Sequence, residues 1–183
     1  MRQLVGHLIV DSRPAKLTKH ISNSKSDGIR LNLNLLGEAV LGESEANYRY
    51  EETFAMLRRD DVDYVSIKLS AVASQLSMWG FETTVQRLVD KLTPLYEYAA
   101  KQPQKKFINL DMEEYRDLGL TILVFKKLLA KPELQNLEAG IVLQAYLPDA
   151  FEALKELTQF ATERVANGGA SIKARIVKGA NLA

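Results

Sequence analysis

Five short apolar runs, separated by longer segments with helical periodicity, constrain the fold of this 183-residue chain most. The runs are rich in Ile, Val, Leu and aromatic residues, and each is short enough for a single strand. They occupy residues 29–36, 64–69, 107–110, 141–145 and 172–177. Strands that alternate with helices indicate repeated βαβ units and therefore a parallel sheet.

The segments between the runs carry the apolar stripes of amphipathic helices. One stripe runs from Val85 to Ala99 and is interrupted by Pro94, which either restarts the helix or kinks it. A second stripe runs from Leu118 to Leu129, and Asp149 is expected to cap the helix that follows the fourth run.

The spacing of the runs favours a closed sheet. Successive runs begin 31 to 43 residues apart, and a (β/α)8 barrel of about 250 residues uses about 31 residues per unit. We therefore predict an α/β fold, a (β/α)8 TIM-like barrel of which the chain holds about the first five βα units. Residues 28–183 would form this partial barrel, and residues 1–27 an N-terminal leader packed on the outside of the first units.

Composition excludes several kinds of site. The 24 Lys and Arg residues are balanced by 23 Asp and Glu residues, and the net charge of +1 gives no electrostatic footprint for nucleic acid. Cysteine is absent, and only two histidines occur, so we expect no metal site and no cysteine nucleophile. No run approaches the roughly 20 apolar residues that span a bilayer, and no signal peptide is recognisable. We expect a soluble, cytoplasmic domain.

Polar residues stand where the predicted strands end. Lys68, Asp111 and Gln144 end the second, third and fourth runs, Arg175 lies within the fifth, and Glu38 follows the first. In a parallel barrel all carboxyl ends of the strands open on one face, which holds the active site. These residues are therefore expected to converge, although the plainer alternatives are solvated loop residues or a structural Lys68–Asp111 ion pair.

Three common catalytic motifs are missing from the sequence. It contains no P-loop, no G-x-G-x-x-G fingerprint and no G-x-S-x-G elbow. Phosphate binding by a P-loop, dinucleotide binding of the Rossmann type and a serine hydrolase of the elbow type are therefore not expected.

Wider motifs surround the strand ends. They read LLGEA at residues 35–39, YVSIKLS at 64–70, FINLDMEEY at 107–115, IVLQAYL at 141–147 and RIVKGAN at 175–181. In this order and spacing they resemble the FAD-dependent proline dehydrogenases. The resemblance is greatest to the proline dehydrogenase domain of the bifunctional bacterial proline utilisation A proteins, and it covers about residues 28–183.

The resemblance implies a distorted (β/α)8 barrel that holds FAD at the carboxyl ends of its strands. It implies oxidation of L-proline to Δ1-pyrroline-5-carboxylate in proline catabolism, with a hydride passing to flavin N5 and electrons leaving to a quinone. A parent protein is then expected to carry a C-terminal pyrroline-5-carboxylate (glutamate semialdehyde) dehydrogenase module and to associate peripherally with the inner face of the membrane.

The resemblance also assigns contacts to the flavin. Arg175 matches an arginine near flavin N5, where a fixed cation stabilises negative charge on the reduced ring. Gln144 matches a residue that hydrogen-bonds the pyrimidine edge. Val177 matches a backbone contact to the flavin, with Lys178 and Gly179 beside it.

The substrate contacts follow in the same way. Lys68 matches a lysine that holds the proline carboxylate. Asp111 matches an aspartate next to substrate and flavin that fixes Lys68 and Arg175, so these three are the expected catalytic residues. Glu38 matches a glutamate that pairs with a substrate-site arginine located beyond residue 183.

Three positions depart from better-known members of the family. Asn181 stands where many have a tyrosine that forms a wall of the substrate site. Asn34 stands where others have Asp, and Met112 stands where others have Ala beside the flavin. None of these changes removes a polar group assigned above.

Three hypotheses for function remain open from the sequence. The first is a truncated proline dehydrogenase domain, for which we expect weak FAD binding, no turnover by the isolated chain and self-association through open sheet edges. The second is a barrel Schiff-base lyase without flavin that uses Lys68 as its nucleophile. The third is a non-catalytic half-barrel that completes itself with a partner chain.

Overall fold

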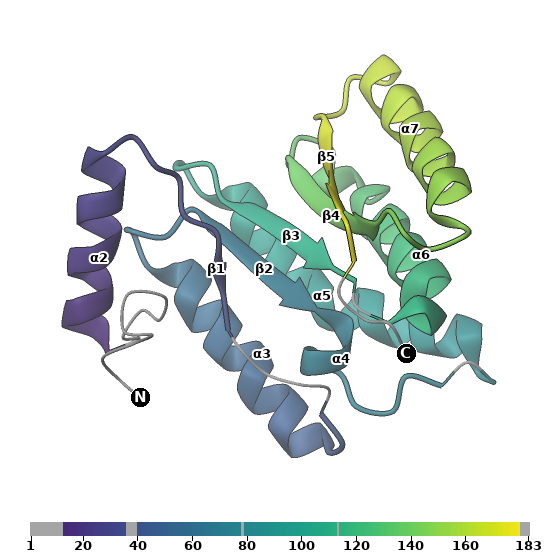
Figure 1. The fold of residues 1–183 in the computed structure, drawn as a ribbon, viewed down its shortest axis with the longest axis horizontal. Coiled ribbons are helices and arrows are strands. Elements are labelled where there is room, and N and C mark those ends of the chain that lie inside the picture. Colours follow the sequence, from purple (N-terminus) through teal and green to yellow (C-terminus); the bar gives the residue numbers. More distant parts are fainter. Residues whose placement is uncertain (1–12, 36–39, 78, 113, 180–183) are drawn as a thin grey trace.

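The computed structural model describes residues 13–35, 40–77, 79–112 and 114–179. These form one parallel sheet, and most of its helices lie on a single face (Figure 1). The strands are β1 (Leu33–Asn34), β2 (Tyr64–Lys68), β3 (Phe107–Asp111), β4 (Ala139–Gln144) and β5 (Ile172–Val177).

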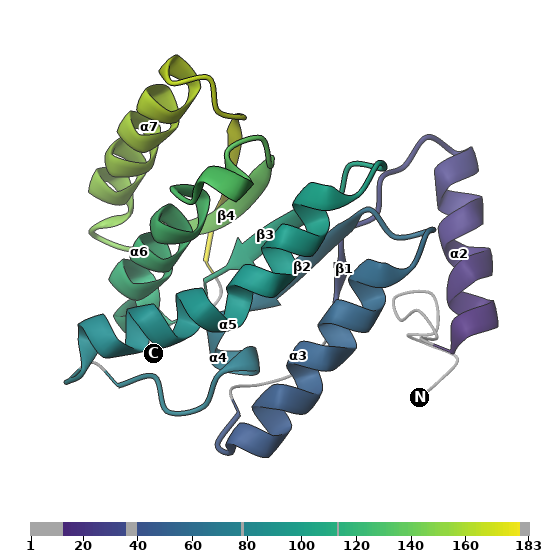
Figure 2. The same cartoon turned by 180° about the vertical axis from the view of Figure 1, so that it is seen from behind.

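Four long helices cover the sheet from behind, and a fifth stands beside β1 (Figure 2). The covering helices are α3 (Glu43–Arg58), α5 (Phe81–Lys101), α6 (Leu118–Leu129) and α7 (Ala150–Ala166). The helix beside β1 is α2 (Pro14–Ser26), which buries Leu17 and Ile21 in the common core. Three short helical segments complete the fold, namely α4 (Leu69–Val72), η1 (Tyr115–Asp117) and η2 (Pro132–Leu134).

Sheet topology confirms the predicted α/β class. The strands lie in chain order, β1-β2-β3-β4-β5, and every neighbouring pair is parallel. The register sets Lys68 opposite Asp111, and Gln144 opposite Val177. Since all strands point the same way, their carboxyl ends lie along one edge of the sheet.

Successive side chains along each strand point to opposite faces of the sheet, so one face forms the core and the other carries the polar residues. One set of side chains, which includes Ile67, Leu110 and Ile141, is at most 2% exposed and joins the hydrophobic core. The alternate set points to the other face and carries the polar groups, such as Lys68 and Asp111. The sheet is therefore apolar toward its helices and polar on the face that they leave uncovered.

Several local predictions need correction. The first strand is two residues long rather than eight, because it is an edge strand whose beginning is open to solvent, with Ile29 52% exposed. The α5 helix continues through Pro94 without restarting, since fully buried Leu92 and Leu95 anchor it on both sides. No side-chain capping bond comes from Asp149, whose carboxylate instead accepts the Tyr115 hydroxyl.

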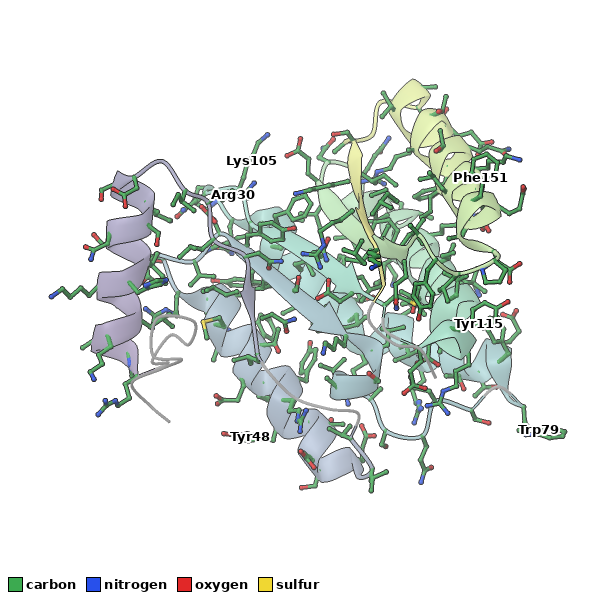
Figure 3. The ribbon with its side chains drawn as sticks, in the orientation of Figure 1. Arg30, Tyr48, Trp79, Lys105, Tyr115 and Phe151 are labelled. Carbon is green, nitrogen blue, oxygen red and sulfur yellow. The ribbon has the colours of Figure 1, made fainter. Side chains whose placement is uncertain are left out.

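Two residues have environments that are unusual for their type. Trp79 is fully exposed (Figure 3). Lys106 is 5% exposed, and its ammonium donates to the backbone carbonyls of Arg59 and Val62. Burial lowers the pKa of Lys106. These carbonyls lie between α3 and β2, so Lys106 joins the beginning of β3 to that connection.

Glu43 begins α3 and ties it to α5. Its carboxylate accepts hydrogen bonds from the Lys91 ammonium at 2.7 Å and from the Ser74 hydroxyl at 2.6 Å. These bonds, that from Lys91 first, lower the pKa of Glu43 from 4.5 to about 2. Because the folded state has the lower pKa, the contacts stabilise the fold above pH 4.5, and this contribution is lost as the pH falls toward 2.

We expect Glu43→Gln to lower the free energy of unfolding at neutral pH by about 1 kcal/mol, because the half-exposed pair is screened by solvent. The difference from wild type should shrink as the pH falls through the acid range and Glu43 becomes protonated. Urea unfolding at neutral pH and at about pH 3 measures both quantities. Glu52→Gln, at an exposed position of the same helix, is the control; equal effects of the two variants would contradict the assignment.

Candidate active site

An open pocket of about 360 Å³ lies at the carboxyl ends of the strands. Because side chains alternate between the two faces of a strand, polar side chains near the end of each strand point into this pocket. It is lined by Asn34, Lys68, Asp111, Met112, Val142, Gln144, Arg175, Val177, Lys178 and Gly179. Eight of these were predicted as site residues, and the structure brings them together. Two further predicted residues, Glu38 and Asn181, lie outside the described part of the chain.

Arg175 and Asp111 form the ion pair of the pocket. The guanidinium Nη2 of Arg175 lies 2.9 Å from Oδ1 of Asp111. The Asp111 side chain is 11% exposed and the Arg175 side chain 38% exposed. The pair spans β4, where Val142 occupies the register position opposite Arg175. An arginine on the edge strand is thus held over the sheet by a carboxylate two strands away.

Asp111 is also held by uncharged donors. Its Oδ1 accepts from the amide of Asn109 at 2.5 Å and the hydroxyl of Ser66 at 3.3 Å, and its Oδ2 accepts from the amide of Asn34 at 3.2 Å. Burial raises the pKa of Asp111, while the charge of Arg175 and the hydrogen bonds from Ser66 and Asn109 limit the rise. Because every one of these groups donates to it, Asp111 is a carboxylate acceptor in this arrangement.

Lys68 faces the same carboxylate from β2. It stands opposite Asp111 in the β2–β3 register, and its charge lowers the pKa of Asp111. The Arg175 guanidinium forms an ion pair with the same carboxylate. The charges of both Lys68 and Arg175 therefore act on Asp111.

Gln144 joins the ends of β3 and β4. Its side chain is 4% exposed, and its Nε2 donates to the backbone carbonyl of Met112 at 3.2 Å. The next two backbone amides, those of Ala145 and Tyr146, donate to the carbonyls of Val177 and Lys178. The ends of three neighbouring strands are therefore tied together around the pocket.

Gly179 allows the chain to leave β5 beside Tyr146. Its φ of +113° lies in the region that L-residues avoid, and a Cβ atom there would lie 1.7 Å from the Tyr146 ring. A larger residue would displace either the ring or the end of β5. This is a structural reason for the glycine predicted to lie beside the flavin.

Sequence reasoning missed the uncharged donors around Asp111. Asn34, Ser66 and Asn109 were not predicted as site residues, although Asn109 precedes Asp111 by two positions and Ser66 precedes Lys68 by two. That spacing puts each pair on one face of its strand. Applying the period of two backward from each strand end would have found Ser66 and Asn109.

Among the described residues, no group of three or more His, Cys, Asp or Glu side chains is placed to hold a metal ion. Among the helices described, none is long and apolar enough to cross a membrane.

Comparison with solved structures gives closely similar chains. Over its full length the chain is 53% identical to Proline Utilization A (PutA) from Corynebacterium freiburgense, with a TM-score of 0.94, and it covers 19% of that chain. PutA from Bdellovibrio bacteriovorus inactivated by N-propargylglycine is 30% identical over 93% of the chain, with a TM-score of 0.82 and 20% of its own length covered. A mutant PutA from Bradyrhizobium japonicum is 22% identical over 82% of the chain and 16% of its own, with a TM-score of 0.70, and shows the fold alone.

The chain spans about a fifth of the length of the first two solved relatives. No curated protein sequence matches it. Residues 17–183 match the family described as Proline dehydrogenase, which includes all of the described pocket residues. The family match, the shared fold and the convergence of the predicted residues agree, and the chain belongs to the proline dehydrogenase family.

Proposed function

We propose that this pocket oxidises L-proline to Δ1-pyrroline-5-carboxylate with FAD as its bound cofactor. The observation that carries the proposal is the Arg175–Asp111 pair, which shares one pocket with Lys68 and Gln144 in a chain of the proline dehydrogenase family. A cation held at fixed geometry suits a reaction that builds negative charge on a cofactor ring.

The polar groups of the pocket fit a flavin. The buried Nε of Arg175 has no hydrogen-bond partner among the residues that the structure describes, so a donor is available beside the pocket. The Gln144 side chain adds an amide, which matches the alternating donors and acceptors of the flavin pyrimidine edge. Arg175, Gln144 and the backbone at Val177 would hold the ring, and bound FAD would supply the hydride acceptor.

Substrate binding is proposed to rest on Lys68. L-proline carries a carboxylate, and an ammonium is the point charge that binds such a group. Asp111 would keep Arg175 in place and balance the two cations, so that the proline carboxylate is not drawn to the guanidinium instead. Met112 would pack beside the ring, since it is 4% exposed and lines the same pocket.

The proposal extends to the partners of the reaction. A quinone would receive the electrons, in keeping with the family resemblance, and a pyrroline-5-carboxylate dehydrogenase module of the same polypeptide would consume the product. Peripheral contact with a membrane would give access to a quinone dissolved in lipid.

Lys68→Met is expected to raise the KM for L-proline by about tenfold to hundredfold, because a charge-assisted contact to the substrate is worth about 1.5–3 kcal/mol. Steady-state assays use an FAD-loaded protein that carries these residues within the complete proposed barrel, and they trap the product with o-aminobenzaldehyde to measure the change. Lys126→Met is the matched control, since Lys126 pairs with Glu156 on the helical face. Absence of product from the wild-type protein would refute the proposed function, and an unchanged KM in Lys68→Met would refute the role of Lys68.

We further propose that the five βα units are the first five of a (β/α)8 barrel. The sheet has β1 and β5 at its two edges, and closure of a barrel would cover both. A protein made of these 183 residues alone is expected to bind FAD weakly and to self-associate through the exposed edges. Light scattering after size exclusion should give more than one chain per particle; a monomer at all concentrations would contradict this expectation.

A further inference from the structure

Asn34 reaches across the sheet to the central carboxylate. It lies on the edge strand β1, opposite Ser66 of β2. Its Nδ2 donates to Oδ2 of Asp111 at 3.2 Å, so the bond passes over β2 and ends on β3. The contact joins residues 77 positions apart in the chain, and it makes β1 part of the pocket.

The two oxygens of Asp111 have different partners. Oδ2 accepts from Asn34, whereas Oδ1 accepts from Arg175 at 2.9 Å, from Asn109 and from Ser66. A carboxylate held at both oxygens cannot rotate about its χ2 bond without losing contacts at each. The bond from Asn34 therefore fixes which oxygen is presented to Arg175.

The amide at residue 34 is chemically different from the acid of the same shape. An aspartate there would place a second carboxylate within hydrogen-bond distance of Asp111, and two such groups share one proton. The amide donates a hydrogen bond at every pH and adds no charge. The charged groups that face Asp111 from the described elements are Arg175 of β5 and Lys68 of β2, both cations.

We propose that Asn34 is a positioning residue of the proline site, which holds Oδ2 of Asp111 so that Oδ1 remains engaged with Arg175. This inference rests on the proposed function for its role in the reaction. The contact itself does not depend on that function and can be measured in the chain without cofactor or substrate.

Carboxyl ¹³C NMR titration of Asp111 in the full chain tests the contact directly. Asn34→Asp is expected to raise the pKa of Asp111 by about one or more, because a neighbouring like charge disfavours ionisation. Asn34→Ala should raise it by less, since it only removes a donor to the charged form. Asn47→Asp is the matched control with the same change in charge; Asn47 lies on α3, where it accepts from Lys91, and the pKa of Asp111 should stay at its wild-type value.

A second measurement tests the role in the reaction. In the FAD-loaded protein, Asn34→Asp should move the acidic limb of the kcat/KM profile to higher pH by the same amount, and Asn34→Ala should lower kcat/KM by about tenfold. A pKa of Asp111 in both Asn34 variants equal to that in Asn47→Asp would overturn the inference. If the pKa moves while the wild-type protein forms no product from proline, the proposed function fails and the contact stands.

Discussion

Replacing Arg164 with methionine is expected to lower the free energy of unfolding by about 3–5 kcal/mol. Arg164 lies on α7 and is 8% exposed, and burial lowers its pKa. Its guanidinium donates to five backbone carbonyls, those of Leu129, Leu134, Gln135, Leu137 and Ala170. One side chain thus joins the end of α6, the η2 segment and the connections that lead into β4 and β5.

The effect is large because five carbonyls would lose their donor, and three of these hydrogen bonds are buried and two part-buried. Leaving such groups without partners costs about 1–3 kcal/mol each, although water entering the site would reduce the sum. Methionine retains much of the apolar stem, so the loss reports on the hydrogen bonds more than on packing. At about 2–4 °C per kcal/mol for a chain of this size, the expected fall in Tm is about 10 °C.

Thermal and urea unfolding measure this change, with Arg116→Met as the control. Arg116 forms a surface ion pair with Glu114, and its loss should cost less than about 1 kcal/mol. Arg164→Lys should recover only part of the stability, because an ammonium has three donors and no planar fork. If Arg164→Met were as stable as Arg116→Met, the five carbonyls would not depend on the guanidinium.

Replacing Arg175 with methionine is expected to slow flavin reduction by L-proline by about 10²–10³-fold. The guanidinium is fixed by Asp111, and the pocket beside it would hold the flavin ring. Removing it takes away the cation that would stabilise the reduced ring and leaves Asp111 without its ion-pair partner in the pocket. Arg175→Lys should restore less than the full rate, since the planar geometry that reaches Asp111 is lost.

Stopped-flow single turnovers of the FAD-loaded protein separate this effect from substrate binding. Lys173→Met is a matched control, because Lys173 precedes Arg175 by two residues on the same face of β5 but lies over the ring of Tyr64. The control should reduce flavin at close to the wild-type rate. Equal rates in Arg175→Met and wild type would remove the guanidinium from the mechanism.

The strand ends were predictable because their signals are local. An apolar run that ends in Lys68, Asp111 or Gln144 gives both the strand and the polar residue at its carboxyl end, and parallel strands bring those ends together. The structure confirms this convergence in one pocket. The short first strand was not predictable, since its apolar residues give the same local pattern whether or not they are paired.

The contacts that position the site depend on register, which the local pattern does not specify. Asn34 meets Asp111 across 77 positions, and Arg175 meets it across 64. Arg164 likewise looks like a solvated residue on the polar face of a helix until its five carbonyl partners are placed. Such contacts follow from the packing of distant segments rather than from periodicity along one of them.

Anaerobic addition of L-proline to the FAD-loaded protein with the complete barrel should bleach the visible absorption of the oxidised flavin. Δ1-pyrroline-5-carboxylate should appear in equal amount, and Arg175→Met should bleach far more slowly. A protein that holds FAD but keeps its oxidised spectrum in saturating L-proline would not oxidise proline at this pocket.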